Sequence, residues 1–211
     1  MEKLIDSNKD ILVIYHGNCR DGIASAYIAS KVFGENASYI PQVHGKEYIP
    51  KNIKDKDIYI LDFCYSKKDL LYIEKEANRL VVIDHHVSTE KDIKCLKEYV
   101  FDNKHSGAYL THKYFFPNQK VPTLFKYISD YDTFNNKLPF TKEITTYIYK
   151  DDLDELTFRR LKELEKELDE WKLKYYTTLE QLIGVKAELE ETLTRISILS
   201  DLHIDPKNDL I

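Results

Sequence analysis

The sequence has few of the residues that mark several protein classes. Among 211 residues there are only three cysteines, Cys19, Cys64 and Cys95, and no two of them form a C-x-x-C pair. An odd number without such pairs argues against a disulfide framework, so we expect reduced thiols. No apolar run approaches the roughly 18 residues of a membrane-spanning helix, and the opening residues lack the pattern of a secretory signal. We therefore expect a cytoplasmic protein that does not enter a membrane.

Two signatures of phosphate binding are also absent. The chain contains neither G-x-x-x-x-G-K-[ST] nor G-x-G-x-x-G, which gives little support to a nucleoside triphosphatase or a dinucleotide-dependent enzyme. Residues 1–140 carry 20 Lys and Arg against 19 Asp and Glu, whereas residues 141–211 carry 11 against 17. Without a basic stripe, tight nonspecific binding to long duplex DNA is disfavoured. A small phosphorylated substrate or a short oligonucleotide is compatible with this charge.

Strand-like and helix-like segments alternate along the first part of the chain, which is 43% hydrophobic overall. Short apolar runs rich in β-branched residues predict strands at 11–16, 37–43, 57–63 and 80–84. The second of these is expected at a sheet edge, because Pro41 would remove a ladder hydrogen bond from a central strand. Helical patterns predict helices at 23–34, 67–79, 106–116 and 121–134. The alternation implies right-handed crossovers and a parallel sheet.

The predicted fold is therefore α/β: a parallel five-stranded sheet with helices on both faces, followed by a C-terminal helical segment. We place the sheet domain in residues 1–140 and the helical extension in residues 141–211. From about residue 151 onward the sequence is charged and leucine-bearing. Because four clean heptads are lacking, a helical hairpin packed on the sheet domain is favoured over a long coiled coil. A homodimer through these helices is the protein partner that the pattern permits.

Residues of metal-binding types follow three of the predicted strands. His16 ends the first strand, Asp62 follows the third, and Asp84, His85 and His86 close the fourth. Further carboxylates stand at Asp21, Asp130 and Asp132. The carboxyl ends of parallel strands line the ligand crevice, so we expect these groups to converge there. Burying so many polar groups is costly unless divalent ions neutralise them.

The residue types also indicate which ions to expect. Carboxylates combined with imidazoles suit manganese, zinc or iron better than calcium. Asp62 stands on a central strand, between His16 on one side and His85 on the other. It is the expected bridge between two ions held ~3.5–4 Å apart, as in two-metal hydrolases.

Five segments in a fixed order resemble the DHH phosphoesterase superfamily. They are YHGNCRDGIASA, YILDF, VVIDHH, HSGAYLTHKYFF and YISDYDTF, and together they span about residues 10–135. Members of this superfamily include family II inorganic pyrophosphatases, single-strand exonucleases, oligoribonucleases and cyclic-dinucleotide phosphodiesterases. The resemblance implies two divalent ions, usually manganese, in a parallel α/β domain. It implies a hydrolase in which activated water attacks a phosphodiester or phosphoanhydride of a small nucleotide or short oligonucleotide.

Carried over position by position, the resemblance assigns roles to residues of this chain. The metal ligands would be His16, Asp21, Asp62, His85 and Asp130, with Asp132 as the alternative to Asp130. His86 would contact the scissile phosphate, and Asp84 would be either a further ligand or the partner that fixes the tautomer of His85. These two are the candidate catalytic residues.

Three other residues are candidates for substrate binding. Arg20 either reaches a substrate phosphate or is a solvated surface side chain. Ser106 and Gly107 begin a predicted helix. The free amides at its start would help to bind phosphate, or Ser106 would only cap the helix, and the two roles are compatible.

Two departures from the superfamily pattern motivate a second hypothesis. The first motif offers only Asp21 where two aspartates are commoner, and Cys19 either replaces the missing ligand as a thiolate, which would favour zinc, or packs under the loop. The chain has six glycines and lacks the glycine-rich, histidine-containing loop of the usual C-terminal substrate domain. The alternative is a DHH-like binding or regulatory module that acts through its helical tail.

Overall fold

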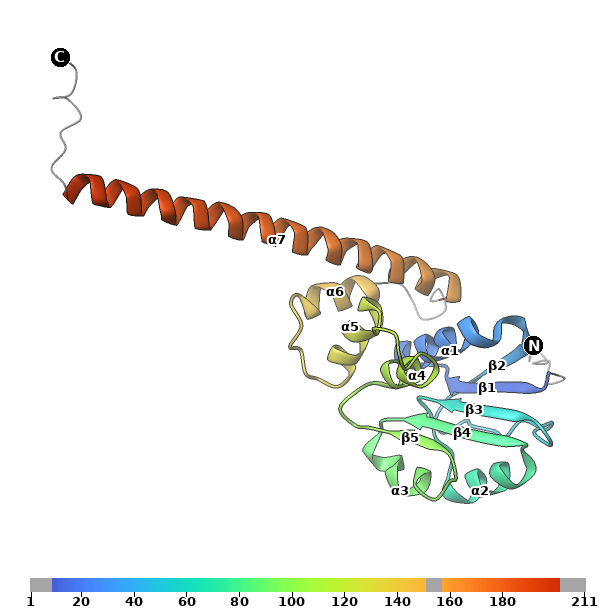
Figure 1. Ribbon diagram of the computed structural model, residues 1–211. Helices are drawn as coiled ribbons and strands as arrows, with labels where there is room; N and C mark the ends of the chain where they lie inside the picture. Colours follow the sequence, from blue (N-terminus) through green and yellow to red (C-terminus); the bar gives the residue numbers. More distant parts are fainter. Residues whose placement is uncertain (1–8, 151–156, 202–211) are drawn as a thin grey trace, which may run out of the picture. The chain divides into compact units, whose positions relative to one another are not determined.

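A parallel five-stranded sheet organises the first part of the chain in the computed structural model, which describes residues 9–150 and 157–201. Its strands are β1 (Ile11–His16), β2 (Ala37–Gln42), β3 (Asp57–Leu61), β4 (Arg79–Asp84) and β5 (Tyr99–Phe101). They stand in the order β2-β1-β3-β4-β5, and every pair is parallel (Figure 1). The predicted α/β class with a parallel five-stranded sheet is confirmed.

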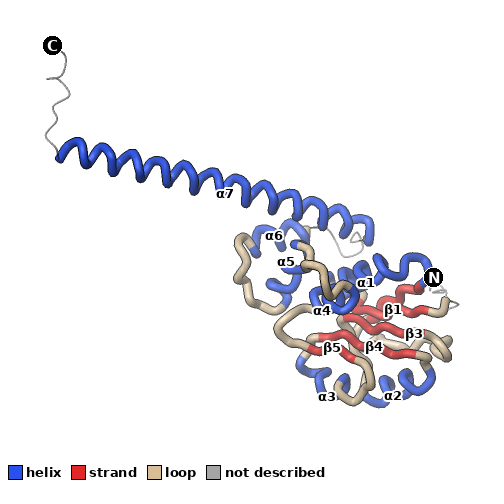
Figure 2. The backbone as a smooth tube through the Cα atoms, in the orientation of Figure 1, coloured by secondary structure: helices blue, strands red, loops and turns tan. Residues whose placement is uncertain are grey.

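Helices cover both faces of this sheet, as predicted (Figure 2). α1 (Arg20–Phe33) and α4 (Gly107–Phe115) lie on one face, and α2 (Lys67–Glu76) and α3 (Glu90–Ile93) lie on the other. Strand periodicity explains the division, because alternate side chains point to opposite faces. Leu12 packs in one core cluster with Leu70 of α2, whereas its neighbour Val13 packs in the other with Leu110 of α4. Burial of each such side chain contributes roughly 1.5–3 kcal/mol.

Proline and glycine fix the edge of the sheet and the end of the first helix. β2 is an edge strand, and its Pro41 pairs with Tyr15 of β1. Gly34 follows α1 with a φ of 53°, and its N–H donates to the carbonyl of Ser30. The predicted edge position and the predicted end of this helix are therefore both confirmed.

Three further helices follow the sheet in sequence. They are α5 (Thr123–Asp132), α6 (Thr141–Ile148) and α7 (Phe158–Asp201). Two short 3-10 turns lie earlier, between the strands: η1 (Gly34–Asn36) and η2 (Val87–Thr89). Residues up to Glu167 form one compact unit, so α6 and the first turns of α7 belong with the sheet, beyond the predicted domain end at residue 140. Tyr27 of α1 donates a 2.9 Å hydrogen bond to Glu165, which helps to attach these turns.

The second compact unit begins at Leu168 and consists of the remainder of α7. The predicted helical hairpin is wrong, because α7 continues for 44 residues without a turn. The start of the predicted helical segment, residues 151–156, lies outside the described residues. Among the residues that are described, no helix has both the length and the apolar character required to cross a bilayer.

Candidate metal centre

The carboxyl ends of three neighbouring strands meet at one edge of the sheet. β1, β3 and β4 are adjacent, and their arrowheads in Figure 1 point toward the side where α4 and α5 lie. His16 ends β1, Asp62 follows β3, and His85 follows β4. Oδ2 of Asp62 lies 3.8 Å from Nδ1 of His16, and Oδ1 lies 3.2 Å from Nε2 of His85. One carboxylate therefore faces two histidines from two different strands, as the sequence pattern predicted.

Asp62 is buried without a hydrogen-bond partner for its carboxylate. The residue is 1% exposed and neither oxygen accepts a hydrogen bond, although Nε2 of His85 is close. Burial, and then the negative charge of Asp21, raises the pKa of Asp62 well above its usual value. Its backbone has a φ of 52°, in the left-handed region that Asp and Asn adopt more readily than most residues other than glycine. A cation bound here would supply the partner that these two buried oxygens lack.

Both histidines that face Asp62 have environments that keep them neutral. Burial lowers the pKa of His85, and burial followed by the charge of His44 lowers the pKa of His16. Nδ1 of His16 is buried and has no hydrogen-bond partner. A neutral imidazole is the form that binds a metal ion.

Asp21 is held in place by the amino terminus of α4. Its Oδ1 accepts from the hydroxyl of Ser106 at 2.7 Å and from the amide of Ala108 at 2.9 Å, and its Oδ2 accepts from the amide of Gly107 at 2.6 Å. Oδ2 also lies 3.8 Å from Nε2 of His85. Asp21 is thus fixed with one oxygen turned toward the cluster that His16, Asp62 and His85 form at the strand ends.

These contacts decide between the two interpretations of Ser106 and Gly107. Ser106 is the N-cap of α4, since its hydroxyl accepts from the amide of Tyr109 at 3.5 Å. The expectation that the free amides of this helix bind a substrate phosphate is wrong, because those of Gly107 and Ala108 are bonded to Asp21. They position an acid of the cluster instead.

Gly107 also allows the helix to approach the site closely. A Cβ atom at this position would stand 2.6 Å from Cβ of Asp62 and 3.0 Å from Oδ2 of Asp21. Gly22 has a similar function in α1, where a Cβ would lie 2.2 Å from the carbonyl oxygen of His16. Both glycines therefore keep the helices near the strand ends.

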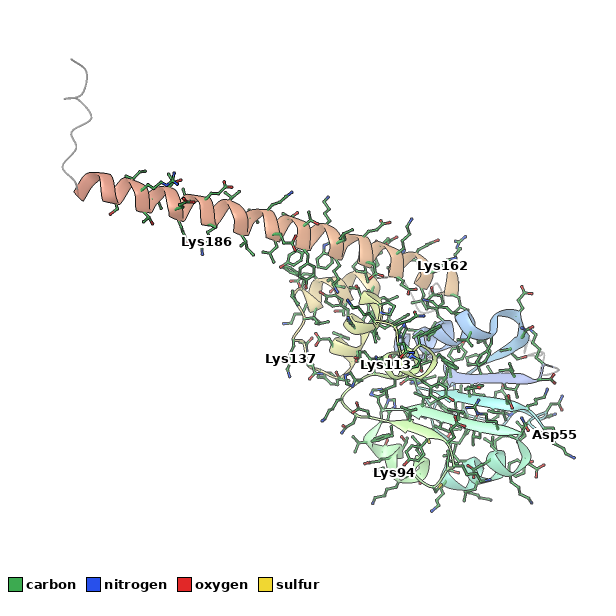
Figure 3. The ribbon with its side chains drawn as sticks, in the orientation of Figure 1. Asp55, Lys94, Lys113, Lys137, Lys162 and Lys186 are labelled. Carbon is green, nitrogen blue, oxygen red and sulfur yellow. The ribbon has the colours of Figure 1, made fainter. Side chains whose placement is uncertain are left out.

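The structure brings Asp132, and not Asp130, to the cluster. Oδ2 of Asp132 lies 3.3 Å from Nε2 of His85, and burial, followed by the charge of Asp21, raises the pKa of Asp132 to about 7. The carboxylate of Asp130 instead accepts hydrogen bonds from the loop before α6 and from the start of that helix. The donors are the amide of Lys137 at 3.0 Å, the amide of Leu138 at 3.0 Å and the hydroxyl of Thr141 at 2.6 Å. Asp130 shapes this loop, on which Figure 3 labels Lys137.

Asp84 contacts the ring of His86, whereas the sequence predicted that it would be a metal ligand or would fix the tautomer of His85; its carboxylate also lies within reach of Asp62 and His85. Its Oδ1 lies 2.7 Å from Nδ1 of His86 and accepts from the backbone amide of His85 at 2.8 Å. Its Oδ2 accepts from the hydroxyl of Thr89 at 2.7 Å. The hydrogen bond to Asp84 raises the pKa of His86. The side chain of His86 is 41% exposed, and Nε2 is the ring nitrogen that Asp84 leaves uncontacted.

Cys19 lies within the cluster, and Arg20 does not point to it. The thiol of Cys19 is close to ligand atoms of His16 and Asp62, and burial raises its pKa to about 11. Arg20 donates from Nη2 to the carbonyl of Tyr149 at 3.0 Å, and its guanidinium lies 4.6 Å from the centre of that ring. Arg20 is therefore neither fully solvated nor directed at the metal cluster.

His44 is a residue that the sequence analysis missed. Its ring centre lies 5.0 Å from that of His16, and the ring stacks on Phe63 at 4.7 Å. The residue follows β2 by two positions, so the rule that strand ends line the crevice would have identified it.

Within residues 9–150 and 157–201, three groups of side chains have ligand atoms within 4.8 Å of one another: Asp62, Asp84, His85 and His86; His16, Cys19 and Asp62; and Asp21, His85 and Asp132. Asp62 belongs to two of these groups, as does His85. The donor set of carboxylates, imidazoles and one thiol fits manganese, zinc or iron. Together with the unpartnered oxygens of Asp62, it fits the two divalent ions that the sequence predicted.

Comparisons with known proteins establish the fold further and leave the chemistry open. No family model matches the chain. It is 32% identical over 166 residues to an uncharacterized protein of Acanthamoeba polyphaga mimivirus, a match that covers 70% of this chain and 39% of the viral protein. The crystal structure of an uncharacterized protein from Helicobacter pylori has a similar fold, with a TM-score of 0.50 and 12% identity. That likeness covers 76% of this chain and 63% of the bacterial one, and it concerns the fold alone.

Proposed function

We propose that this chain is a metal-dependent phosphoesterase of the DHH type that hydrolyses a phosphodiester or phosphoanhydride in a small nucleotide or short oligonucleotide. The observation that carries the proposal is the carboxylate of Asp62, which is buried, accepts no hydrogen bond, and faces His16 with one oxygen and His85 with the other. The order of the five sequence motifs supports the same function. So does the position of the cluster at the carboxyl ends of parallel strands.

The side chains around the cluster divide into ligands and positioning groups. His16, Asp21, Asp62, His85 and Asp132 would hold two divalent ions, preferably Mn²⁺. Such ions polarise phosphoryl oxygens and lower the pKa of water. The amino terminus of α4 fixes Asp21, so that one oxygen stays directed at His85. Asp84 is a positioning residue for His86.

His86 is the candidate for direct contact with the phosphate. Asp84 accepts from Nδ1, so a protonated ring presents its second N–H at Nε2. That donor would stabilise the charge that develops on the phosphoryl oxygens in the transition state. The partial exposure of His86 leaves room for a substrate to reach it.

The test combines metal binding with turnover in the full chain. We expect Mn²⁺ to bind in titration calorimetry and to stimulate cleavage of an aryl phosphodiester and of a short oligonucleotide. Asp62→Asn and His85→Ala should abolish Mn²⁺ binding and cleavage. Asp10→Asn, which changes an exposed acid, should preserve Mn²⁺ binding and cleavage. Absence of divalent-ion binding by the wild-type chain would refute the proposal.

A second candidate function rests on the outer part of α7. Leu179, Leu182, Leu189, Leu193 and Ile196 are 38–61% exposed. With Tyr175 and Lys186 they occupy positions at alternating steps of four and three residues. Such a seam fits a copy of itself in a coiled coil. We therefore propose that a second copy of this chain pairs with α7, which would make the tail a dimerisation element of a binding or regulatory module.

Light scattering on the full chain tests this dimer. Leu182→Glu combined with Leu189→Glu should convert the dimer to a monomer. Leu173→Glu combined with Ala187→Glu introduces the same charges at exposed positions off the seam, and it should leave the dimer intact. A monomeric wild-type chain would rule out this assembly.

A further inference from the structure

A cavity of about 580 Å³ lies beside α6, and no feature of the proposed metal centre explains it. It is lined by Tyr131, Lys142, Thr145, Thr146, Tyr149 and Lys150. These residues come from α5, from α6 and from the two positions that follow α6. The volume falls in the range of small-molecule sites, roughly 300–1,000 Å³.

The cavity adjoins the metal cluster through two of its tyrosines. Tyr131 directly precedes Asp132 in α5. Tyr149 accepts from Arg20, the neighbour of Asp21 in sequence, through its carbonyl oxygen. The cavity is therefore linked to the cluster through residues that are the sequence neighbours of Asp132 and Asp21.

The lining has the chemistry of a nucleotide site. The rings of Tyr131 and Tyr149 meet edge to face, with centres 5.1 Å apart, and Tyr131 is 43% exposed. A partly exposed aromatic ring of this kind can stack on a base. Lys142 is exposed on the same helix as Thr145, and its ammonium group suits a phosphate. Lys150 stands over the ring of Tyr147 at 4.1 Å, which leaves Lys142 as the principal cation.

We propose that this cavity binds the nucleoside and the non-scissile phosphate of a short oligonucleotide, with Tyr131 stacking on the base and Lys142 pairing with the phosphate. The inference rests on the proposed phosphoesterase function and deepens it. It assigns substrate selection to α6. Apart from Tyr131, the lining residues lie outside the five motifs that resemble the superfamily.

Titration calorimetry on the full chain measures this binding, and the arm with EDTA measures it without turnover. The probe is a diadenylate that bears a terminal phosphate, added once with EDTA and once with Mn²⁺. Lys142→Glu should weaken binding by about tenfold or more, as expected for loss of a charged phosphate contact. Lys113→Glu reverses the charge of an exposed lysine on α4 and should have no effect; Figure 3 labels Lys113. Tyr131→Ser should weaken binding several-fold, and Tyr131→Phe should restore it.

Kinetics separate failure of this site from failure of the proposed function. If the chain hydrolyses the diadenylate, Lys142→Glu should raise KM for it with little change in kcat, and hydrolysis of an aryl phosphodiester should be unaffected. If no hydrolysis occurs with any metal, binding that depends on Lys142 and Tyr131 still supports the site. Failure to bind the diadenylate in either condition would overturn the inference, as would a KM that Lys142→Glu leaves unchanged. Inorganic tripolyphosphate that binds equally well, with no effect of Tyr131→Ser, would overturn the assignment of a nucleoside.

Discussion

Oδ1 of Asp62 lies 3.2 Å from Nε2 of His85, and the two groups form no hydrogen bond. The pairing of β3 with β4 produces this proximity. Leu61 of β3 stands opposite Ile83 of β4, so the residues that follow the two strands leave the sheet at the same edge. Two ligand-type atoms this close, and misaligned for a hydrogen bond, are arranged as they would be around a shared cation. The first prediction tests this arrangement through stability instead of activity.

Asp62→Asn should remove metal-dependent stabilisation without destabilising the metal-free chain. Ligand binding to the folded state stabilises it by about 2.7 kcal/mol when the free ion is at 100 times its Kd, so Mn²⁺ should raise Tm of the wild type. The variant replaces a buried carboxyl group that makes no hydrogen bond, and asparagine tolerates the positive φ at this position, so its Tm in EDTA should be close to that of the wild type. Scanning calorimetry with EDTA and with Mn²⁺ measures both. A large loss of Tm in EDTA would contradict the absence of hydrogen bonds to Asp62.

Asp130 and Asp132 should respond in opposite ways to the same substitution. Asp130→Ala removes the acceptor for two amides and one hydroxyl, which should lower the free energy of unfolding by about 2–4 kcal/mol while Mn²⁺ affinity stays nearly unchanged. Asp132→Ala should lower Mn²⁺ affinity at least tenfold with little loss of stability. Urea denaturation in EDTA and calorimetric titration with Mn²⁺ separate the two effects. The reverse pattern would restore Asp130 as the ligand.

Gly107→Ala should damage the site although alanine favours a helix. The added Cβ would stand 2.6 Å from Cβ of Asp62, so the helix start must shift and the amides that hold Asp21 shift with it. We expect at least a tenfold loss of Mn²⁺ affinity, or a lower Tm. Gly184→Ala is the matched control, since a Cβ there meets nothing within 4 Å, and it should stabilise α7 by up to ~1 kcal/mol. Two variants with the same behaviour would show that the close approach is unimportant.

Local patterns in the sequence predict most of the sheet and the place of the site. Apolar runs located four strands, Pro41 marked the edge, and the polar residues after the strands identified the cluster edge. The same patterns do not predict which distant residue a given side chain contacts. Asp130 and Asp132 differ only in which neighbour each faces, and the contact between Asp21 and the start of α4 joins residues 86 positions apart in sequence.

The tail illustrates a different limit. The charged, leucine-bearing sequence of the tail predicted helix correctly, but a break between two helices requires a turn signal. None lies between Trp171 and Leu182, and the only glycine of the tail, Gly184, stays inside α7. The sequence therefore supported one continuous helix better than the hairpin that we favoured.

Acid should destabilise the fold partly through His112. This histidine is 3% exposed, Nδ1 has no hydrogen-bond partner, and the ring lies near Phe116 and Phe125. Burial, and then the charge of Lys31, lowers its pKa.

Above the unfolded pKa of about 6.5 neither state binds the proton, so His112 has no effect on stability there. As the pH falls below that value the unfolded chain takes up a proton that the folded chain resists, and stability is lost. Urea denaturation in EDTA between pH 7.5 and pH 5 should therefore show a shallower loss for His112→Gln than for the wild type. Equal slopes would mean that the folded protein accommodates the protonated ring.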